Sequence, residues 1–91
     1  MEYEWDEGKN EANIAKHGVS FEAMVDFQWD TAAIRPSDRQ GEARWAAIGY
    51  IGNRLHHVVY TERGSGRRII SLYKANQRDR RRYEQSHRDR S

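Results

Sequence analysis

Hydrophobic and polar residues follow a helical spacing near the N-terminus of the chain and a period of two over its middle. At the start, Tyr3 and Trp5 alternate with acidic residues, a pattern that predicts a short first strand. Asp6 suits the N-cap of a helix through Lys16, and Gly18 suits the left-handed position just beyond its end. The first eighteen residues therefore predict a strand followed by a narrow, mostly polar helix.

A second helix is predicted directly after the first. Ser20 can cap it, and Phe21, Met24 and Val25 recur at helical spacing, which gives this helix a buried face. For these three apolar residues, a place in the core is a simpler interpretation than a role in binding a ligand.

From Thr31 onward the period changes to two, which is typical of β-strands. Strands are predicted over residues 31–34, 44–51, 55–62 and 67–74. The first is expected to end at Arg35-Pro36, and a polar loop (37–41) and turns at 52–53 and 63–66 separate the strands. Gly52 and Asn53 are expected to supply the positive φ values of a two-residue hairpin turn. Asn76 can cap a final helix through about Ser86, and residues 87–91 are expected to fray.

The alternation also predicts which side chains share a face. In the strand over 55–62, Leu55, His57, Val59 and Thr61 are expected on one face and the other four residues on the opposite face. In the strand over 67–74, the face shared by Arg68, Ile70, Leu72 and Lys74 is expected to lie opposite that of Ile69, Ser71 and Tyr73. The expected core comprises Trp5, Phe21, Met24, Val25, Ile48, Val58 and Ile70.

These elements predict the α+β class, with an antiparallel sheet of about four to five strands, two N-terminal helices and one C-terminal helix. The helices are expected to cover one face of the sheet. With 91 residues, the chain has room for one core, which we assign to a single domain over residues 1–86.

Composition narrows the class of protein. The chain has no cysteine, so disulfides, thiolate nucleophiles and cysteine-based zinc sites are excluded. Its longest uncharged apolar stretch has seven residues, 45–51, whereas a membrane-spanning helix needs roughly 20. The acidic N-terminus lacks the apolar segment of a signal peptide, and we expect a cytoplasmic protein with no membrane association.

Charge is distributed unevenly along the chain. Residues 1–31 have a net charge of −6, residues 32–62 of +1 and residues 63–91 of +7, although the total is only +2. A basic C-terminal part favours a polyanionic partner, because lysine and arginine gain free energy by displacing counterions from phosphates. The alternative is a solvated charged tail.

The four histidines do not predict a metal site. His56 and His57 are adjacent on a predicted strand and must point to opposite faces, and no His-x-His or His-x-x-x-His spacing occurs. The glycines at 64 and 66 lack the features of a phosphate-binding loop. No cofactor is therefore expected.

The strongest chemical signal lies between residues 67 and 84. A strand with basic residues is followed by a helix on which Arg78, Arg81 and Arg82 share one face. Such a surface is similar to that of a small metal-independent ribonuclease, where the 2′-hydroxyl of RNA is the nucleophile and the protein supplies a base, an acid and positive charge. The alternative is that these arginines only solvate an exposed helix.

This interpretation gives a list of site residues. The expected cationic cleft is bordered by Arg63, Arg68, Lys74, Arg81 and Tyr83, with Glu62 and Glu84 as candidate bases or as ion-pair partners of the arginines. Arg67, Arg78 and Arg82 are the expected RNA-binding residues.

Several segments resemble the BrnT family of toxins. They are Glu4-Trp5-Asp6, Lys9-Asn10, the run from Asn13 to Ala23, Glu42, Arg44-Trp45, Ile48-Gly49, the runs 59–64 and 68–71, Lys74-Ala75 and the run 80–84. The resemblance implies a RelE-like fold, a ribonuclease that inhibits translation, and neutralisation by a BrnA antitoxin with a ribbon-helix-helix part. It further implies that the complex represses its own operon, so that DNA is contacted only indirectly, through the antitoxin.

One position departs from the pattern of the family. Where the family has Ala-Arg in the last strand, this chain has Leu72-Tyr73, and a phenol is neutral at pH 7. Either the activity is weakened, or one of the neighbouring residues Arg68, Lys74 and Arg81 compensates for the missing charge. A catalytically weak module that acts by binding antitoxin or nucleic acid is therefore the second functional hypothesis. The aromatic residues Trp29, Trp45, Tyr50 and Tyr60 are candidates for an antitoxin contact, with acidic antitoxin residues against the arginines. The alternative is that all four are core residues.

Overall fold

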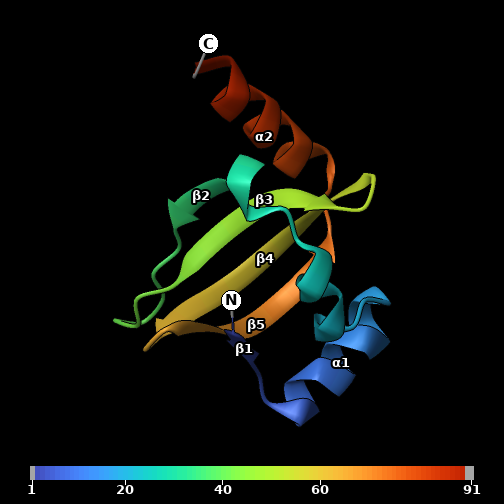
Figure 1. Cartoon of the computed structure of the whole chain (residues 1–91), viewed down its shortest axis with the longest axis vertical. Helices are drawn as coiled ribbons and strands as arrows, with labels where there is room; N and C mark the ends of the chain where they lie inside the picture. The colour runs from blue at the N-terminus through green and yellow to red at the C-terminus, as the bar shows by residue number, and fades with distance from the viewer. Residues whose placement is uncertain (1, 90–91) are drawn as a thin grey trace.

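The computed structural model describes residues 2–89 (Figure 1). Its elements are β1 (Glu2–Glu4), α1 (Glu7–His17), the 3-10 helices η1 (Phe21–Asp26) and η2 (Trp29–Thr31), β2 (Ala33–Pro36), β3 (Trp45–Ile51), β4 (Arg54–Arg63), β5 (Gly66–Lys74) and α2 (Gln77–Asp89). The helix α2 continues three residues beyond its predicted end at Ser86, and the last two residues of the predicted tail, 90–91, lie outside the described residues.

The five strands form one mixed sheet in the order β1-β5-β4-β3-β2. Strands β2, β3, β4 and β5 pair antiparallel with one another, as predicted. β1 runs parallel to β5, so the prediction of an antiparallel sheet is wrong for this edge. A helix follows β1, so β1 has no hairpin partner and pairs with a distant strand instead. Gly66 permits this approach, because a Cβ atom there would lie 2.8 Å from the carbonyl oxygen of Glu2.

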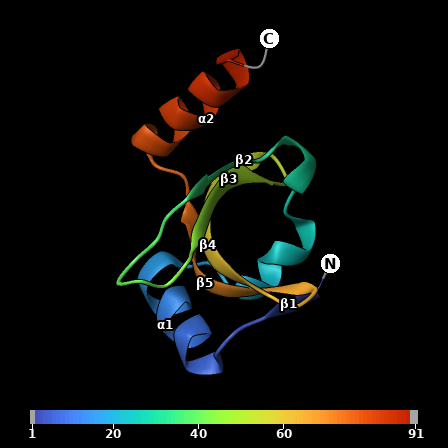
Figure 2. The same cartoon turned by 90° about the vertical axis from the view of Figure 1, so that its left-hand side faces the viewer.

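Helical segments lie on both faces of the sheet, which corrects the prediction of a single covered face. The sheet is strongly curved; η1 and η2 fill its concave side, whereas α1 and α2 lie on the convex side at opposite ends (Figure 2). The reason is the composition of β3, whose residues are apolar or glycine in both alternating sets, so that each face needs cover. The α+β class is confirmed.

The main core lies on the concave side, where Phe21 and Met24 of η1 pack against Val58 and Leu72 of the sheet. A β-bulge in the β4–β5 ladder pairs Val59 with Ser71 but Tyr60 with Ile69, leaving Ile70 as an extra residue. Ile69 and Leu72 therefore face the same side, and Ile69 is buried in place of Ile70. The strict alternation predicted for this strand is wrong at the bulge.

The predicted core is confirmed for Phe21, Met24, Ile48 and Val58, which are at most 1% exposed. Trp5 is half-buried and packs edge-on against Phe21. Val25 is 79% exposed, because the predicted second helix is the 3-10 helix η1, whose three-residue turns place Phe21 and Met24 on the same side and Val25 outside.

The residues that cap the helices are those predicted from the sequence. Asp6 accepts a hydrogen bond from Lys9 N, and Gly18, at φ 72°, ends α1. At the start of α2, Asn76 and Asp79 form a reciprocal capping box, in which each side chain accepts a hydrogen bond from the other residue's backbone N–H. This box fixes the position at which α2 leaves the sheet.

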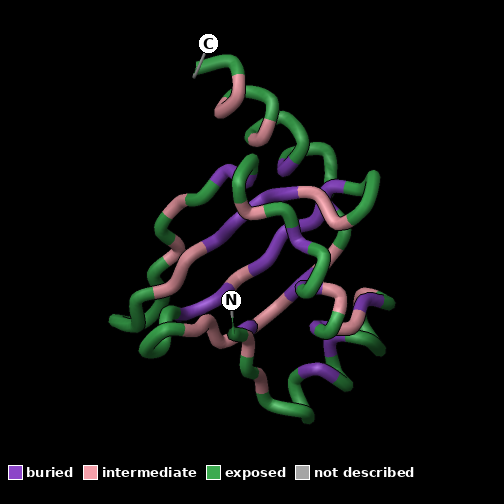
Figure 3. The backbone as a smooth tube through the Cα atoms, in the orientation of Figure 1, coloured by how far each residue is buried: buried purple, intermediate pink, exposed green. Residues whose placement is uncertain are grey.

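The helix α2 is held against the sheet through its first half, which contains the buried Asp79 and the half-buried Tyr83. Tyr83 packs edge-on against Tyr50, beside a small convex-side cluster of Ile48, Leu55 and Ala75. Buried residues are concentrated in the central strands, whereas most residues of α2 are exposed (Figure 3). Among residues 2–89, no helix is long and apolar enough to cross a membrane.

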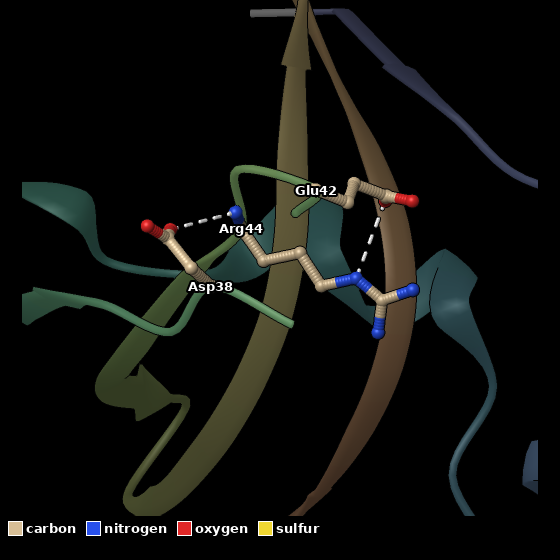
Figure 4. A network of polar contacts seen from close by, with 3 residues as sticks. All are labelled: Asp38, Glu42 and Arg44. Atoms are coloured by element: carbon tan, nitrogen blue, oxygen red, sulfur yellow. Dashed lines mark hydrogen bonds and ion pairs between the residues drawn. The ribbon is translucent and has the colours of Figure 1, made fainter. Parts of the chain in front are cut away.

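The loop between β2 and β3 closes on itself. Arg44 N donates a hydrogen bond to Asp38 Oδ1, and Arg44 Nε pairs with Glu42 Oε1 at 3.2 Å (Figure 4). Gln40 and Gly41, with φ values of 52° and 79°, form the turn. Pro36 pairs with Trp45 at the end of β2, a position that an edge strand tolerates. At the β3–β4 turn only Gly52 has a positive φ, so the expectation for Asn53 is wrong.

Candidate active site

Five side chains from four elements lie within electrostatic range of one another on the convex face, next to the first turns of α2. They are Arg35 of β2, His57 of β4, Tyr73 of β5, and Asp79 and Arg82 of α2, and we call them the convex-face cluster. His57 and Tyr73 are cross-strand partners whose rings stack with centroids 4.8 Å apart and planes 13° apart. Arg35 lies within electrostatic range of Tyr73, Asp79 and Arg82.

Strand register brings Arg35 and His57 to the same side. Arg35 pairs with Ala46, and His57 pairs with Ile48, two residues further along β3. Because successive residues of a strand alternate between faces, Arg35 and His57 both point to the convex side. Asp79 and Arg82 are three residues apart on α2 and lie on one face of that helix.

Burial decides the protonation of His57, which is 6% exposed. Removal from water lowers the pKa of His57 below its ordinary 6.5, and the nearby Arg35 and Arg82 lower it further, while Asp79 opposes them. The imidazole is therefore neutral at pH 7 and can accept a proton.

The other members of the cluster keep complementary charges. Burial raises the pKa of Tyr73 above 10, and Asp79 adds to this effect, so the phenol keeps its proton at neutral pH. Burial lowers the pKa of Arg35 below its ordinary value, and the positive charge of Arg82 lowers it further. Arginine nevertheless stays charged at pH 7, so the cluster offers two guanidinium groups, a protonated phenol and a neutral imidazole.

Two atoms of the cluster are buried without a partner among residues 2–89, namely Arg35 Nε and His57 Nδ1. Thr61 Oγ1, on the same face of β4, is a third such atom. Two more such atoms, Arg67 Nη1 and His87 Nε2, lie outside the cluster. Because buried polar atoms are nearly always hydrogen-bonded, Arg35 Nε and His57 Nδ1 are available to a polar ligand at the cluster.

His56 differs from its neighbour. It lies on the concave face opposite Gly49 and Lys74, and its Nδ1 is 2.9 Å from the carbonyl oxygen of Arg54. The prediction that the two histidines point to opposite faces is confirmed. Across the described part of the chain, no group of three or more His, Asp or Glu residues is arranged to hold a metal ion.

The predicted site residues divide between the two ends of β5. Arg67 and Arg68 lie at its start, with Arg63 beside them at the end of β4, and Lys74 lies at its end. The eight residue steps from Gly66 to Lys74 correspond to about 26 Å of strand. The structure therefore does not bring these residues together in one cleft.

At the start of β5, the predicted residues have other contacts. Arg68 points to the convex face and pairs with Glu4, Nη1 to Oε2, at 3.0 Å. The guanidinium of Arg67 lies over the Trp29 ring on the concave face, 3.8 Å from its centroid. Glu62 is exposed beside Arg67, and Arg63 is exposed near β1.

On α2, Arg78, Arg81 and Arg82 line an open hollow of about 720 Å³ that consists only of residues of this helix. Glu84 is exposed, and Tyr83 is held against Tyr50 in the packing of the helix. Of the ten predicted site residues, Arg82 belongs to the convex-face cluster and Arg68 points to the same face.

Sequence reasoning missed Arg35, His57, Tyr73 and Asp79 as neighbours. The sequence did contain a pattern that singles out His57. Alternation placed it on one face with the apolar Leu55 and Val59, where a histidine is unexpected. What the sequence did not show was which residues of the neighbouring strand share its face, because the bulge at Ile70 changes the face of every following residue in β5 relative to those before it.

Comparison with known proteins identifies the family. A family profile described as the ribonuclease toxin BrnT of type II toxin–antitoxin systems matches residues 5–79. The 1.1 Å crystal structure of the Brucella abortus ribonuclease toxin BrnT is similar to this chain at 33% sequence identity and a TM-score of 0.67, over 85% of this chain and 99% of that chain. No match was found among curated proteins. The chain belongs to the BrnT family of ribonuclease toxins of type II toxin–antitoxin systems.

Proposed function

We propose that this protein is an endoribonuclease that cleaves RNA on its convex face without a metal ion and thereby inhibits translation. His57 is the general base that takes the proton of an RNA 2′-hydroxyl, whose oxygen attacks the adjacent phosphorus. The bond from phosphorus to the 5′-oxygen breaks as Tyr73 protonates that oxygen, which leaves a 2′,3′-cyclic phosphate and a 5′-hydroxyl end. Arg35 and Arg82 stabilise the negative charge that develops on the phosphate, and Tyr73 is a proton donor beside them. The observation that carries the proposal is the buried neutral imidazole next to two arginines.

We assign the base to His57 in place of Glu62 and Glu84, the bases expected from the sequence. Glu62 faces the concave side, and Glu84 is exposed on α2. The other basic residues of the site predicted from the sequence are proposed to bind RNA outside the cluster. They are Arg63, Arg67, Arg68, Lys74, Arg78 and Arg81.

Adjacent histidines allow a matched test of the mechanism. His57→Gln should reduce cleavage of single-stranded RNA by about 10²–10⁴-fold, whereas His56→Gln, on the opposite face, should stay within a few-fold of the wild type. Products with 2′,3′-cyclic phosphate ends, formed in the presence of EDTA, would support the metal-free reaction. Full cleavage by His57→Gln would contradict the role of His57, and loss of activity in EDTA would contradict metal independence.

A type II toxin is held by an antitoxin, and we propose a BrnA-like ribbon-helix-helix protein in a hetero-oligomer that contacts DNA only through the antitoxin. The concave face supports such a contact: Ile34 is 46% exposed there, beside a hollow of about 210 Å³ lined also by Trp45, Tyr60 and Arg67. Acidic antitoxin residues would pair with the arginines. Calorimetry and size-exclusion chromatography with the product of the neighbouring gene test this, and no complex at micromolar concentration would contradict it.

The alternative is a module that only binds antitoxin or RNA, and the specific observation in its favour is Tyr73 at the family's arginine position. Wild-type protein that binds RNA but yields no cleavage products would establish it. We further propose that the protein has a RelE-like fold and acts in the cytoplasm, where its RNA target is.

A further inference from the structure

A second hollow lies on the convex side, between α1 and β5, and nothing in the cleavage mechanism uses it. It has a volume of about 230 Å³ and is lined by one face of α1, including Lys9, Lys16 and His17, and by Ile70 and Ser71 of β5. It is smaller than the pockets of about 300–1,000 Å³ that enclose drug-sized molecules, and is suited to one planar ring.

The floor of this hollow is rigid. Asn13 of α1 is buried, its Nδ2 donates hydrogen bonds to the carbonyl oxygens of Val19 and Leu72, and its Oδ1 accepts one from Leu72 N. β1 pairs only with Gly66 to Arg68, so Asn13 takes the place of a neighbouring strand further along β5. The distance between α1 and β5 is therefore fixed.

The walls combine an apolar surface with positive charge. Ile70 is the extra residue of the bulge, half-exposed and available to contact a ring, and His17 presents an imidazole near it. Lys9 and Lys16 are exposed and seven residues apart on α1, so that their Cα atoms are about 10.5 Å apart along the same side of the helix. Flat bases stack on such surfaces, and phosphates are attracted to such cations.

Two ring contacts connect the hollow to the cluster. His17 lies 5.3 Å from Tyr73, centroid to centroid, and Tyr73 stacks on His57 at 4.8 Å. A nucleotide next to one bound at His57 would therefore reach the hollow.

We propose that this hollow is a nucleotide subsite, which receives one unpaired base of single-stranded RNA next to the cleaved phosphate while Lys9 and Lys16 bind the flanking phosphates. The base lies against Ile70 and His17, and the Ser71 hydroxyl is available to its edge. The subsite rests on the proposed ribonuclease function and adds sequence specificity to it, because cleavage then depends on the identity of one neighbouring base.

Binding can be measured without catalysis, by fluorescence anisotropy of a 2′-O-methyl RNA oligonucleotide that cannot be cleaved. Lys9→Ala and Lys16→Ala should each weaken binding by about 3–10-fold and reduce the slope of log K against log salt by about 0.7. Arg39→Ala removes the same charge from an exposed loop and should leave both quantities unchanged. Unchanged affinity in both lysine variants would overturn the proposal, as would weaker antitoxin binding with RNA binding intact.

Base recognition is tested with a randomised RNA pool. His17→Ala and Ile70→Ala should reduce the ratio of kcat/KM between the best and worst base at one position beside the cut towards 1, while thermal unfolding shows that both variants remain folded. An unchanged base preference overturns the subsite. Absence of cleavage by the wild type overturns the ribonuclease function instead, and the anisotropy experiment still decides the subsite.

Discussion

His56 and His57 show how one peptide bond separates a structural residue from a chemical one. Both are buried, and burial lowers the pKa of both imidazoles. Alternation along β4 places His56 against the backbone of Arg54 and places His57 beside Arg35 and α2. What differs is the set of neighbours, so two residues of the same type and similar burial have different chemistry.

The lowered pKa of His57 predicts how activity depends on pH. The imidazole is a base only in its neutral form, which dominates above its pKa, so kcat/KM should fall as the pH is lowered, with a midpoint below 6.5. A pH–rate profile measures this midpoint, and the residual activity of His57→Gln should lack the same limb. A midpoint above 6.5 would mean that His57 is not the group that titrates.

Tyr73 permits a test of the departure from the family's arginine. Tyr73→Arg places a cation against His57, which disfavours the imidazolium form, so the midpoint of the pH–rate profile should move to lower pH than in the wild type. Tyr73→Phe keeps the ring and should leave the midpoint nearly unchanged, even where the rate falls. An upward shift in Tyr73→Arg would contradict the stacked geometry.

At the scale of elements, Asn13 joins α1 to the open edge of β5. In Asn13→Ala, the N–H and C=O groups of Leu72 lose their partners in a buried place, and each such loss costs about 1–3 kcal/mol. We expect the free energy of unfolding to fall by about 3 kcal/mol in urea titrations. Glu11→Ala, exposed on the same helix, should change it by less than about 0.5 kcal/mol, and equal effects of the two variants would contradict this role of Asn13.

The elements that the sequence predicted well are those governed by local chemistry. The three long strands end within one residue of their predicted limits, because alternation and the turn residues Gly52 and Gly64 act over a few positions. The bulge at Ile70 and the parallel pairing of β1 were missed, since both depend on contacts between segments distant in the chain. Gly66 was the available clue, because its missing side chain permits the approach of β1.

At the scale of the molecule, the uneven charge along the chain becomes an uneven charge in space. The acidic β1 pairs with the basic start of β5 through Glu4 and Arg68, which neutralises part of the positive charge there. The basic face of α2 has less such cover and extends beyond the sheet (Figure 1). Composition therefore predicted a cationic surface, but the location of the candidate site depended on the register of β2, β4 and β5.

The last prediction concerns the stability of the whole fold as a function of pH. His56 and His57 have lowered pKa values in the folded protein, so below pH 6.5 the unfolded chain binds protons that the folded protein excludes. Linkage then requires that this part of the stability be complete above pH 6.5 and be lost as the pH falls towards the folded pKa values.

Urea unfolding between pH 7.5 and 5.5 measures the effect above the range in which ordinary carboxylates, with pKa values near 4, begin to titrate. The free energy of unfolding of the wild type should decrease across this window, and that of a double variant, His56→Gln with His57→Gln, should decrease less. His17 and His87 are present in both proteins, so their contributions cancel in the comparison. A wild-type stability that stays constant or rises towards pH 5.5 would contradict the buried, neutral state of both imidazoles, on which the proposed base depends.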